Sequence, residues 1–455
     1  MNEYPDYLDE LLEFLRIPSV STLPEHGGDM IRAAGWVEAA IRKAGIDLVE
    51  THVVDGGHPL VFAERVDDPA NPTVLLYGHY DVQPVDPPDE WKSPPFSPEI
   101  RDGAVYARGS SDDKGQLCTH LFALRELSAR WGDNWPVNIR IIAEGEEEAG
   151  GASIEKWAAE NREKLAADFA VISDTAFLKR DTPSIDYGLR GIVYMEIEVT
   201  GPGRDLHSGV YGGGVMNPGS ALAKILDSLI DLETGRVLIP GFYDDVEAIT
   251  ETDRRLAAEV PFDEREFVDQ AGSKTCWGEK GYSTYERVTS RPTLDINGMT
   301  CGFQGEGAKT VLPRRASAKV SMRIVPHQNP DNIASMFCEH VHAVAPPQVT
   351  VECRKLHAAS GVLLNPESAH ISAARDVMEE VFGARPVLIR SGASIPIATI
   401  FNVELGMDVV FLGFGMPDDA LHSPNEKFEI AQFYKGIEAV MKLLERVANS
   451  ISNVQ

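Results

Sequence analysis

Histidine and acidic side chains follow apolar runs of the sequence at points where strands are expected to end. The first pair, His79 and Asp81, comes after the apolar run 73–77, and a spacing of two residues puts both on one face of an extended chain. The imidazole of such a pair can bind a metal ion while the carboxylate accepts its second N–H and orients the ring. A polar strand end without metal is the alternative, and it is the commoner explanation of a single pair.

Three further segments place acids in comparable positions. Asp112 and Asp113 precede a predicted helix, four of the five residues 144–148 are glutamates after an apolar run, and Asp174 follows another such run. Taken alone, the first of these segments is explained by helix capping and the second by a solvated turn. Like charges repel at a strand end unless a cation compensates them, and adjacent glutamates could serve as one ligand and one general base. Their co-occurrence favours a metal site, because open α/β sheets build their sites at strand ends.

The elements that must position these side chains alternate between helix and strand. Apolar spacing and β-rich runs predict helices at 8–15, 31–41, 114–129, 368–382 and 430–447, and strands at 60–66, 73–77, 138–143, 169–173 and 408–414. This alternation indicates an α/β sheet with parallel strands. In the middle of the chain, strand-like runs at 192–200 and 316–325 flank a helical stretch at 220–230, and they indicate a separate α+β unit.

The composition is that of a globular chain of two or three domains: 455 residues, 43% hydrophobic and 25% charged. Its net charge of −28 argues against nucleic acid or an anionic membrane as a partner, because both require a basic surface. The five cysteines form no C-x-x-C pair, so we expect neither a disulfide framework nor a cysteine-based zinc site, and a reducing cytoplasm fits best. The first residues lack an apolar segment and no long apolar run follows, so secretion and membrane insertion are not expected.

Further motifs complete a family pattern across nearly the whole chain: Gly188–Gly191, Asp205–Gly209, Ala308–Pro313, Ser394–Pro396 and Asp418–Glu426. In this order, the segments resemble the di-zinc metallopeptidase family of carboxypeptidase G, acetylornithine deacetylase and succinyl-diaminopimelate desuccinylase, and within it the carnosinase-type cytosolic dipeptidases. The resemblance implies an α/β fold with a zinc-exopeptidase-like, three-layer catalytic domain formed by residues 1–187 and 361–455. It also implies an inserted α+β lid and dimerisation domain at 188–360.

The resemblance also implies the identity of the site residues. The ligands of two divalent metal ions would be His79, Asp112, Glu148, Asp174 and His422, with Asp112 bridging the ions and joined to the next residue by a cis peptide bond. Asp81 would orient His79, and Glu147 would be the general base. Zinc is the expected metal, with manganese and cobalt as alternatives. Two divalent ions, three carboxylates and a bridging hydroxide would form a cluster without net charge, which can be buried at low cost.

The lid is expected to supply the residues that bind substrate. By resemblance, His207 would reach into the active site from the second subunit of a homodimer and stabilise the oxyanion. Arg323 matches the position that binds the free carboxylate of a dipeptide, and Thr310, His357 and Ser394 match further substrate-binding positions. Ser391 departs from the branch, which tends to have an acid there, so recognition of the amino end of a substrate is expected to differ.

The favoured function is hydrolysis of the peptide bond of dipeptides or very short peptides. A hydroxide bridging the two ions would attack the carbonyl, and Glu147 would transfer the proton to the leaving amine. Deacylation of N-acyl amino acids at the same metal site is the alternative. A non-catalytic binding protein would be expected to have lost a ligand or the base, and this sequence keeps all of them. The expected protein is therefore a cytoplasmic homodimeric hydrolase without nucleic-acid or membrane partners.

Overall fold

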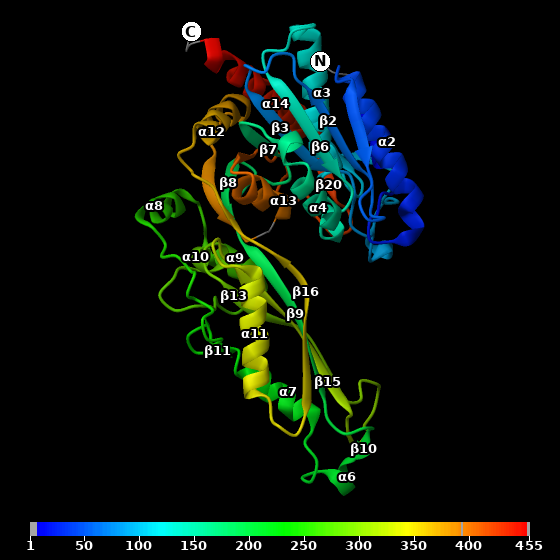
Figure 1. Cartoon of the computed structure of the whole chain (residues 1–455), viewed down its shortest axis with the longest axis vertical. Helices are drawn as coiled ribbons and strands as arrows, with labels where there is room; N and C mark the ends of the chain where they lie inside the picture. The colour runs from blue at the N-terminus through cyan, green and yellow to red at the C-terminus, as the bar shows by residue number, and fades with distance from the viewer. Residues whose placement is uncertain (1–6, 393–394, 453–455) are drawn as a thin grey trace. The chain divides into compact units, whose positions relative to one another are not determined.

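The computed structural model describes residues 7–392 and 395–452, which divide into two compact units (Figure 1). The larger unit contains the chain up to Tyr187, Leu364–Ile389, and the chain from Ile397 onward. The smaller unit contains Gly188–Leu363 and Arg390–Pro396. The insertion expected at 188–360 did not include this last short segment. Among the described residues, none of the helices combines the length and the apolar character needed to span a bilayer.

A six-stranded sheet forms the centre of the larger unit. Its strands are, in spatial order, β1 (Leu48–His52), β2 (Leu60–Arg65), β6 (Asn138–Glu144), β3 (Thr73–His79), β7 (Phe169–Ile172) and β19 (Asp408–Phe411). Strand β3 pairs in parallel with β6 and β7, and β19 pairs in parallel with β7, whereas β1 and β2 are antiparallel. Parallel strands are covered on both faces, which explains why all four residues of β7 are buried and apolar.

Helices cover both faces of this sheet, and on one of them α4 (Ala152–Glu160) packs its Trp157 ring 5.5 Å from that of Phe62 in β2. One connected layer contains α1 (Tyr7–Leu15), α2 (Gly27–Lys43), α3 (Lys114–Trp131), α12 (Ala369–Phe382) and α14 (Ile430–Ser452). A Cβ atom on Gly78 of β3 would meet Leu117 of α3, so this face is closely packed. The preceding residue, Tyr77, points to the opposite face, where its ring lies 6.1 Å from that of Phe401. The α/β three-layer architecture expected from the sequence is therefore confirmed.

The smaller unit contains a four-stranded antiparallel sheet. Its strands are β13 (Thr293–Cys301), β15 (Arg315–Ile324), β9 (Gly191–Thr200) and β16 (Thr350–Ala359). Alternate residues of β9 and β15 are buried, as the alternating sequence predicts. Their apolar side chains form one core with helices α7 (Pro218–Asp227) and α11 (Pro330–Val344). A two-stranded sheet of β10 (Leu206–His207) and β14 (Val311–Leu312) belongs to the same unit.

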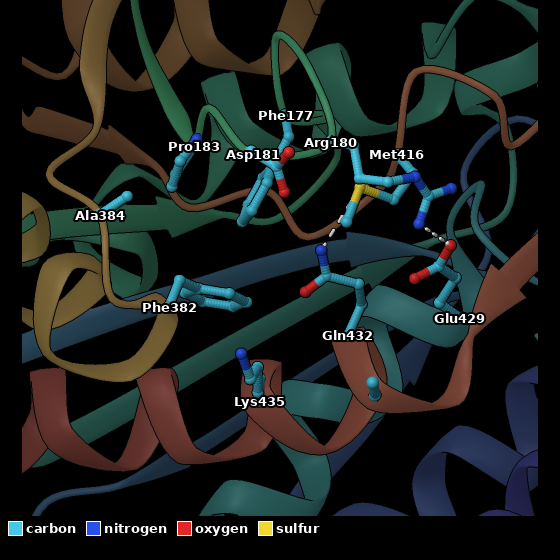
Figure 2. A pocket seen from close by; sticks show the side chains of 11 residues that line it. Phe177, Arg180, Asp181, Pro183, Phe382, Ala384, Met416, Glu429, Gln432 and Lys435 are labelled. Atoms are coloured by element: carbon cyan, nitrogen blue, oxygen red, sulfur yellow. Dashed lines mark hydrogen bonds and ion pairs between the residues drawn. The ribbon is translucent and has the colours of Figure 1, made fainter. Parts of the chain in front are cut away.

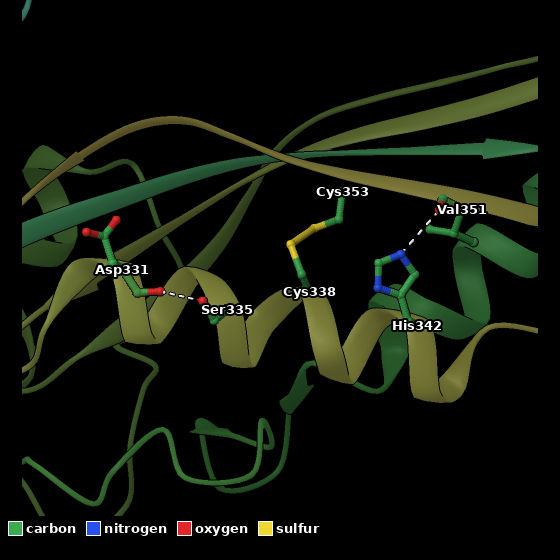
Figure 3. The surroundings of a disulfide bond; sticks show 6 residues. All are labelled: Asp331, Ser335, Cys338, His342, Val351 and Cys353. Carbon is green, nitrogen blue, oxygen red and sulfur yellow. Dashed lines mark hydrogen bonds between the residues drawn. A yellow bond between two sulfur atoms is a disulfide. The ribbon is translucent and has the colours of Figure 1, made fainter.

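A disulfide joins Cys338 of α11 to Cys353 of β16 (Figure 3). The Cα atoms are 5.7 Å apart, within the range that a disulfide can span. The expectation that the cysteines form no disulfide was wrong for this pair. Packing of α11 against the sheet brings the two side chains together, and the sequence carries no local signature of that contact.

This disulfide is expected to stabilise the smaller unit by about 3 kcal/mol, because it closes a loop of 15 residues and so restricts the unfolded chain. Urea denaturation of oxidised protein with and without dithiothreitol measures the effect. The double variant Cys338→Ser and Cys353→Ser is the control, since reductant should not alter its unfolding. Native protein with both thiols free after aerobic purification would contradict the prediction.

Candidate metal centre

His79 ends strand β3 and is fully buried. Its Nε2 atom lies 3.1 Å from Oδ1 of Asp112 and 3.9 Å from Oδ2 of Asp174. Its Nδ1 atom lies 3.1 Å from the backbone oxygen of Asp81 and 3.3 Å from Oδ1 of the same residue. With a proton on Nδ1 facing Asp81, the Nε2 lone pair is directed toward the acids and is available to a cation.

Asp112 occupies the centre of the acidic cluster. Its Oδ2 atom lies 2.9 Å from Nε2 of His422, and Oε1 of Glu148 lies 3.3 Å from the same nitrogen. The peptide bond between Asp112 and Asp113 is cis, as the resemblance implied. His422 comes from a loop that follows β19, the edge strand of the sheet. Side chains from distant parts of the sequence therefore converge on one carboxylate.

The end of β6 supplies the glutamates. Glu147 and Glu148 lie in a short 3-10 helix that begins three residues after the last residue of the strand. The backbone N–H of Glu148 donates to Oδ2 of Asp81 at 3.0 Å, and Gln83 Nε2 donates to Oε2 of Glu148 at 2.7 Å. Asp81 thus contacts both the His79 ring and the Glu148 backbone. Glu144, for which the sequence predicts no separate role, accepts a 2.6 Å hydrogen bond from the hydroxyl of Tyr77.

Two groups of side chains in the described part of the chain have the arrangement needed to hold a metal ion. One consists of His79, Asp112 and Asp174, and the other consists of Asp112, Glu148 and His422. Within each group, one ligand atom from every residue lies within 4.8 Å of the others. Asp112 belongs to both groups, so the structure brings together all five residues that the resemblance implied as ligands.

The pKa shifts in this cluster indicate a shortage of positive charge. Burial, followed by the charge of Asp112, raises the pKa of Asp174 well above its usual value. Burial raises the pKa of Glu147 to about 7 and that of Asp113 to about 8. Hydrogen bonds to Asp112 and Glu148 raise the pKa of His422 to about 10. Protons therefore balance the carboxylates when no cation is present, and a bound cation would displace them.

The donor atoms suit a divalent cation. Carboxylate oxygens and imidazole nitrogens, without a thiolate, are ligands that zinc, manganese and cobalt accept. Although burial acts to raise the pKa of Asp112, hydrogen bonds from His422 and His79 outweigh it and hold this pKa below its usual value. Asp112 is therefore ionised and can offer one oxygen to each group. The residues present thus fit the metal ions that the sequence predicts.

The smaller unit places the expected lid residues in two pairs. The first is His207 and Thr310: β10 pairs with β14, and the Ser208 N–H donates to the Thr310 oxygen at 3.2 Å. His207 is exposed, and its Nδ1 atom accepts a 3.0 Å hydrogen bond from the Gly209 N–H. This hydrogen bond leaves Nε2 as the ring nitrogen that carries a proton and can donate to a ligand.

The second pair is Arg323 of β15 and His357 of β16, which lie on either side of β9. Burial lowers the pKa of His357, and the positive charge of Arg323 lowers it further, so the two side chains are within electrostatic reach. Burial also lowers the pKa of Arg323. Ser394 lies outside the described residues. Ser391 ends strand β18 (Val387–Ser391), where its backbone oxygen accepts from the Arg190 N–H at 3.3 Å.

A separate cavity of about 360 Å³ lies in the larger unit (Figure 2). Phe177 and Phe382 contribute to its lining, and Gln432 and Lys435 project toward it from α14. None of its lining residues belongs to the metal centre or to the expected lid residues. The concave surface and the acidic cluster are therefore distinct features of this unit.

A divalent cation is expected to stabilise the metal-free protein, because it binds the folded cluster and not the unfolded chain. The gain is about 2.7 kcal/mol when the free ion exceeds its Kd by about a hundredfold. Scanning fluorimetry in a chelator, followed by addition of zinc, manganese or cobalt, measures it. Asp112→Asn removes charge from both groups and should lose the shift, whereas Asp102→Asn, at an exposed turn, should keep it. An equal shift in both variants would contradict the assignment.

Comparisons with known proteins agree with this geometry. Residues 75–446 match the model of peptidase family M20/M25/M40. The chain is 32% identical over 458 residues to a Cys-Gly metallodipeptidase of Schizosaccharomyces pombe, covering 98% of this chain and 96% of the relative. It is 31% identical to the human Beta-Ala-His dipeptidase, covering 95% and 88%.

Solved structures lead to the same family. An M20 family metallo-carboxypeptidase from Sulfolobus solfataricus has 34% identity and a TM-score of 0.88, with 99% of this chain and all of that chain covered. The Dug1p dipeptidase of Saccharomyces cerevisiae has 30% identity and a TM-score of 0.83, with 98% and 96% covered. The resemblance inferred from the motifs is confirmed: the chain belongs to peptidase family M20/M25/M40.

Proposed function

We propose that this protein hydrolyses the peptide bond of dipeptides or very short peptides in a metal-dependent reaction. The observation that carries the proposal is the pair of ligand groups sharing Asp112, in a chain of this peptidase family. The names of the relatives support the substrate class, since a Cys-Gly metallodipeptidase and a Beta-Ala-His dipeptidase both match at least 95% of this chain.

Two divalent ions are part of the proposal. His79, Asp112 and Asp174 would hold one ion, and Asp112, Glu148 and His422 would hold the other. When bound, the ions supply Lewis-acid activation of water and of the scissile carbonyl. Zinc is the proposed metal, with manganese or cobalt as alternatives for the same donor set.

Glu147 is proposed as the general base. It lies next to Glu148 in the 3-10 helix after β6, and burial raises its pKa to about 7. When the ions offset the neighbouring acids, the Glu147 carboxylate can accept a proton from the attacking water and return it to the leaving amine. Asp81 would keep the His79 ring and the Glu148 backbone in place while the proton moves.

The smaller unit is proposed to bind the ends of the substrate. Arg323 can form a bidentate pair with the free carboxylate of a dipeptide, and partial burial strengthens such a pair. His207 would donate to the oxyanion from the partner subunit of a homodimer. Thr310, His357 and Ser394 are proposed as further substrate contacts. A cytoplasmic location is also part of the proposal.

A substrate panel tests the reaction class. We expect release of free amino acids from dipeptides, and slower release from tripeptides that have the same C-terminal residue. The reason is that binding of the substrate's free carboxylate limits the length of peptide that fits. N-acetyl and N-succinyl amino acids are included to measure deacylase activity. Longer peptides are included to measure carboxypeptidase activity, after which the Sulfolobus solfataricus relative is named. Chelator-treated protein is the control. Turnover of acyl amino acids alone would overturn the dipeptidase proposal.

Mixed dimers test the base and the shared site together. Glu147→Gln and His207→Ala are each expected to lower kcat by about 10²–10⁴-fold, through loss of proton transfer or of an oxyanion donor. An equal mixture of exchanged subunits should recover about a quarter of the activity, because half of the dimers are mixed and one of their two sites is complete. Retained activity in Glu147→Gln, or no recovery despite verified exchange, would contradict the corresponding role.

A further inference from the structure

Glu426 is a fully buried acid that lies outside both ligand groups. Its carboxylate accepts four hydrogen bonds. Oε2 accepts from Nη1 of Arg108 at 2.8 Å and from the Gly109 N–H at 2.9 Å. Oε1 accepts from the N–H groups of Ser111 at 2.9 Å and Asp112 at 3.1 Å. The chain of residues 108–112 is therefore folded around this single carboxylate.

The folded segment has little room to relax. Gly109 has φ of 84°, and a Cβ atom there would lie 2.6 Å from Cγ1 of Val82. A Cβ atom on Gly115 would lie 1.9 Å from the backbone oxygen of Ser110. Only glycine fits these two positions without displacing its neighbours. The hydrogen bonds to Glu426 thus act on a segment whose shape is already restricted on both sides.

Glu426 also belongs to the loop that carries His422. Its backbone oxygen accepts from the Ala107 N–H at 3.1 Å, and the Ser111 hydroxyl donates to Oδ2 of Asp419 at 2.8 Å. Strand β20 (Lys427–Glu429) continues this connection by pairing with β5 (Ala104–Tyr106). The segments that supply Asp112 and His422 are therefore tied together over several residues, close to the point where the two side chains meet.

All four partners of the Glu426 side chain are donors, so the position requires an acceptor on both oxygens. A glutamine would direct an N–H group at N–H groups and would leave buried donors without a partner. The Arg108 guanidinium is buried as well, and it also donates to the backbone oxygen of Pro84 at 3.0 Å. Neutralising Glu426 would therefore leave this buried cation without its charge partner.

We infer that Glu426 is a positioning residue that folds the 108–112 segment in advance and so holds Asp112 between the two ligand groups before any metal binds. This inference rests on the proposed ligand role of Asp112. Glu426 acts through the backbone of that residue and touches neither substrate nor metal. Its effect should resemble that of other groups that orient metal ligands, whose loss typically weakens metal binding about 10–100-fold.

The test compares Glu426→Gln with Asn425→Gly in the full-length, metal-free protein. Asn425 is the neighbouring residue, has φ of 66°, and makes two side-chain hydrogen bonds to the 90–92 segment. Glycine adopts that φ readily, so this control removes contacts of the same loop without affecting the Asp112 segment. Zinc affinity is measured by competition with a chromophoric chelator, and backbone exchange is measured by deuterium labelling of residues 109–112.

Glu426→Gln is expected to weaken zinc binding about 10–100-fold and to accelerate exchange at 109–112, while Asn425→Gly changes neither by more than about twofold. Glu426→Asp keeps the charge and should recover part of the affinity. Unchanged zinc affinity in Glu426→Gln, or equal weakening in Asn425→Gly, would overturn the inference.

Should Glu426→Gln fail to fold, wild-type protein still tests the inference. The amides of Gly109, Ser111 and Asp112 must be protected from exchange before zinc is added. If these amides exchanged rapidly and were protected only after zinc was added, the metal and not Glu426 would order the segment, and the inference would be overturned. Neither measurement uses hydrolysis, so an error in the proposed substrate class would leave this result unaffected and would be recognised separately in the panel.

Discussion

Repulsion among carboxylates at the ends of β3, β6 and β7 is the constraint on which the larger unit depends. Parallel strands bring these ends to one edge of the sheet, and burial removes the water that would screen the charges. Imidazole protons offset part of this charge, as the raised pKa of His422 indicates. The cluster is therefore stable only with bound protons or with a cation, and this competition couples its protonation to metal binding.

The same cluster is held in place by hydrogen bonds from residues outside the two ligand groups. Tyr77 donates to Glu144, Asp81 accepts from the Glu148 backbone, and Glu426 accepts from the Asp112 segment. Each of these contacts satisfies a buried polar group while fixing a side chain beside it. The hydrogen bonds that position these side chains thus involve the same small group of residues whose carboxylates repel one another. Loss of one hydrogen bond therefore changes both the repulsion and the positions of the side chains.

The sequence predicted those site residues whose positions follow from a local pattern, above all from the end of an apolar strand. His79 and Asp174 could be placed because apolar runs precede them, and the position of His422 came from the family pattern. The function of Glu426 could not be predicted, because its partners lie more than 300 residues earlier in the chain. The Cys338–Cys353 disulfide was missed for a related reason: it depends on how a helix packs on a sheet, which spacing alone does not reveal.

The division of the larger unit into separate stretches of sequence has a consequence for synthesis on the ribosome. Strand β7 pairs with β19, yet the whole of the smaller unit lies between them in the chain. During synthesis, β7 therefore remains an unpaired edge strand until the C-terminal part of the chain has been made. The acidic cluster lacks His422 over the same period. We expect the smaller unit to fold first and the incomplete sheet to be the species most dependent on chaperones during translation.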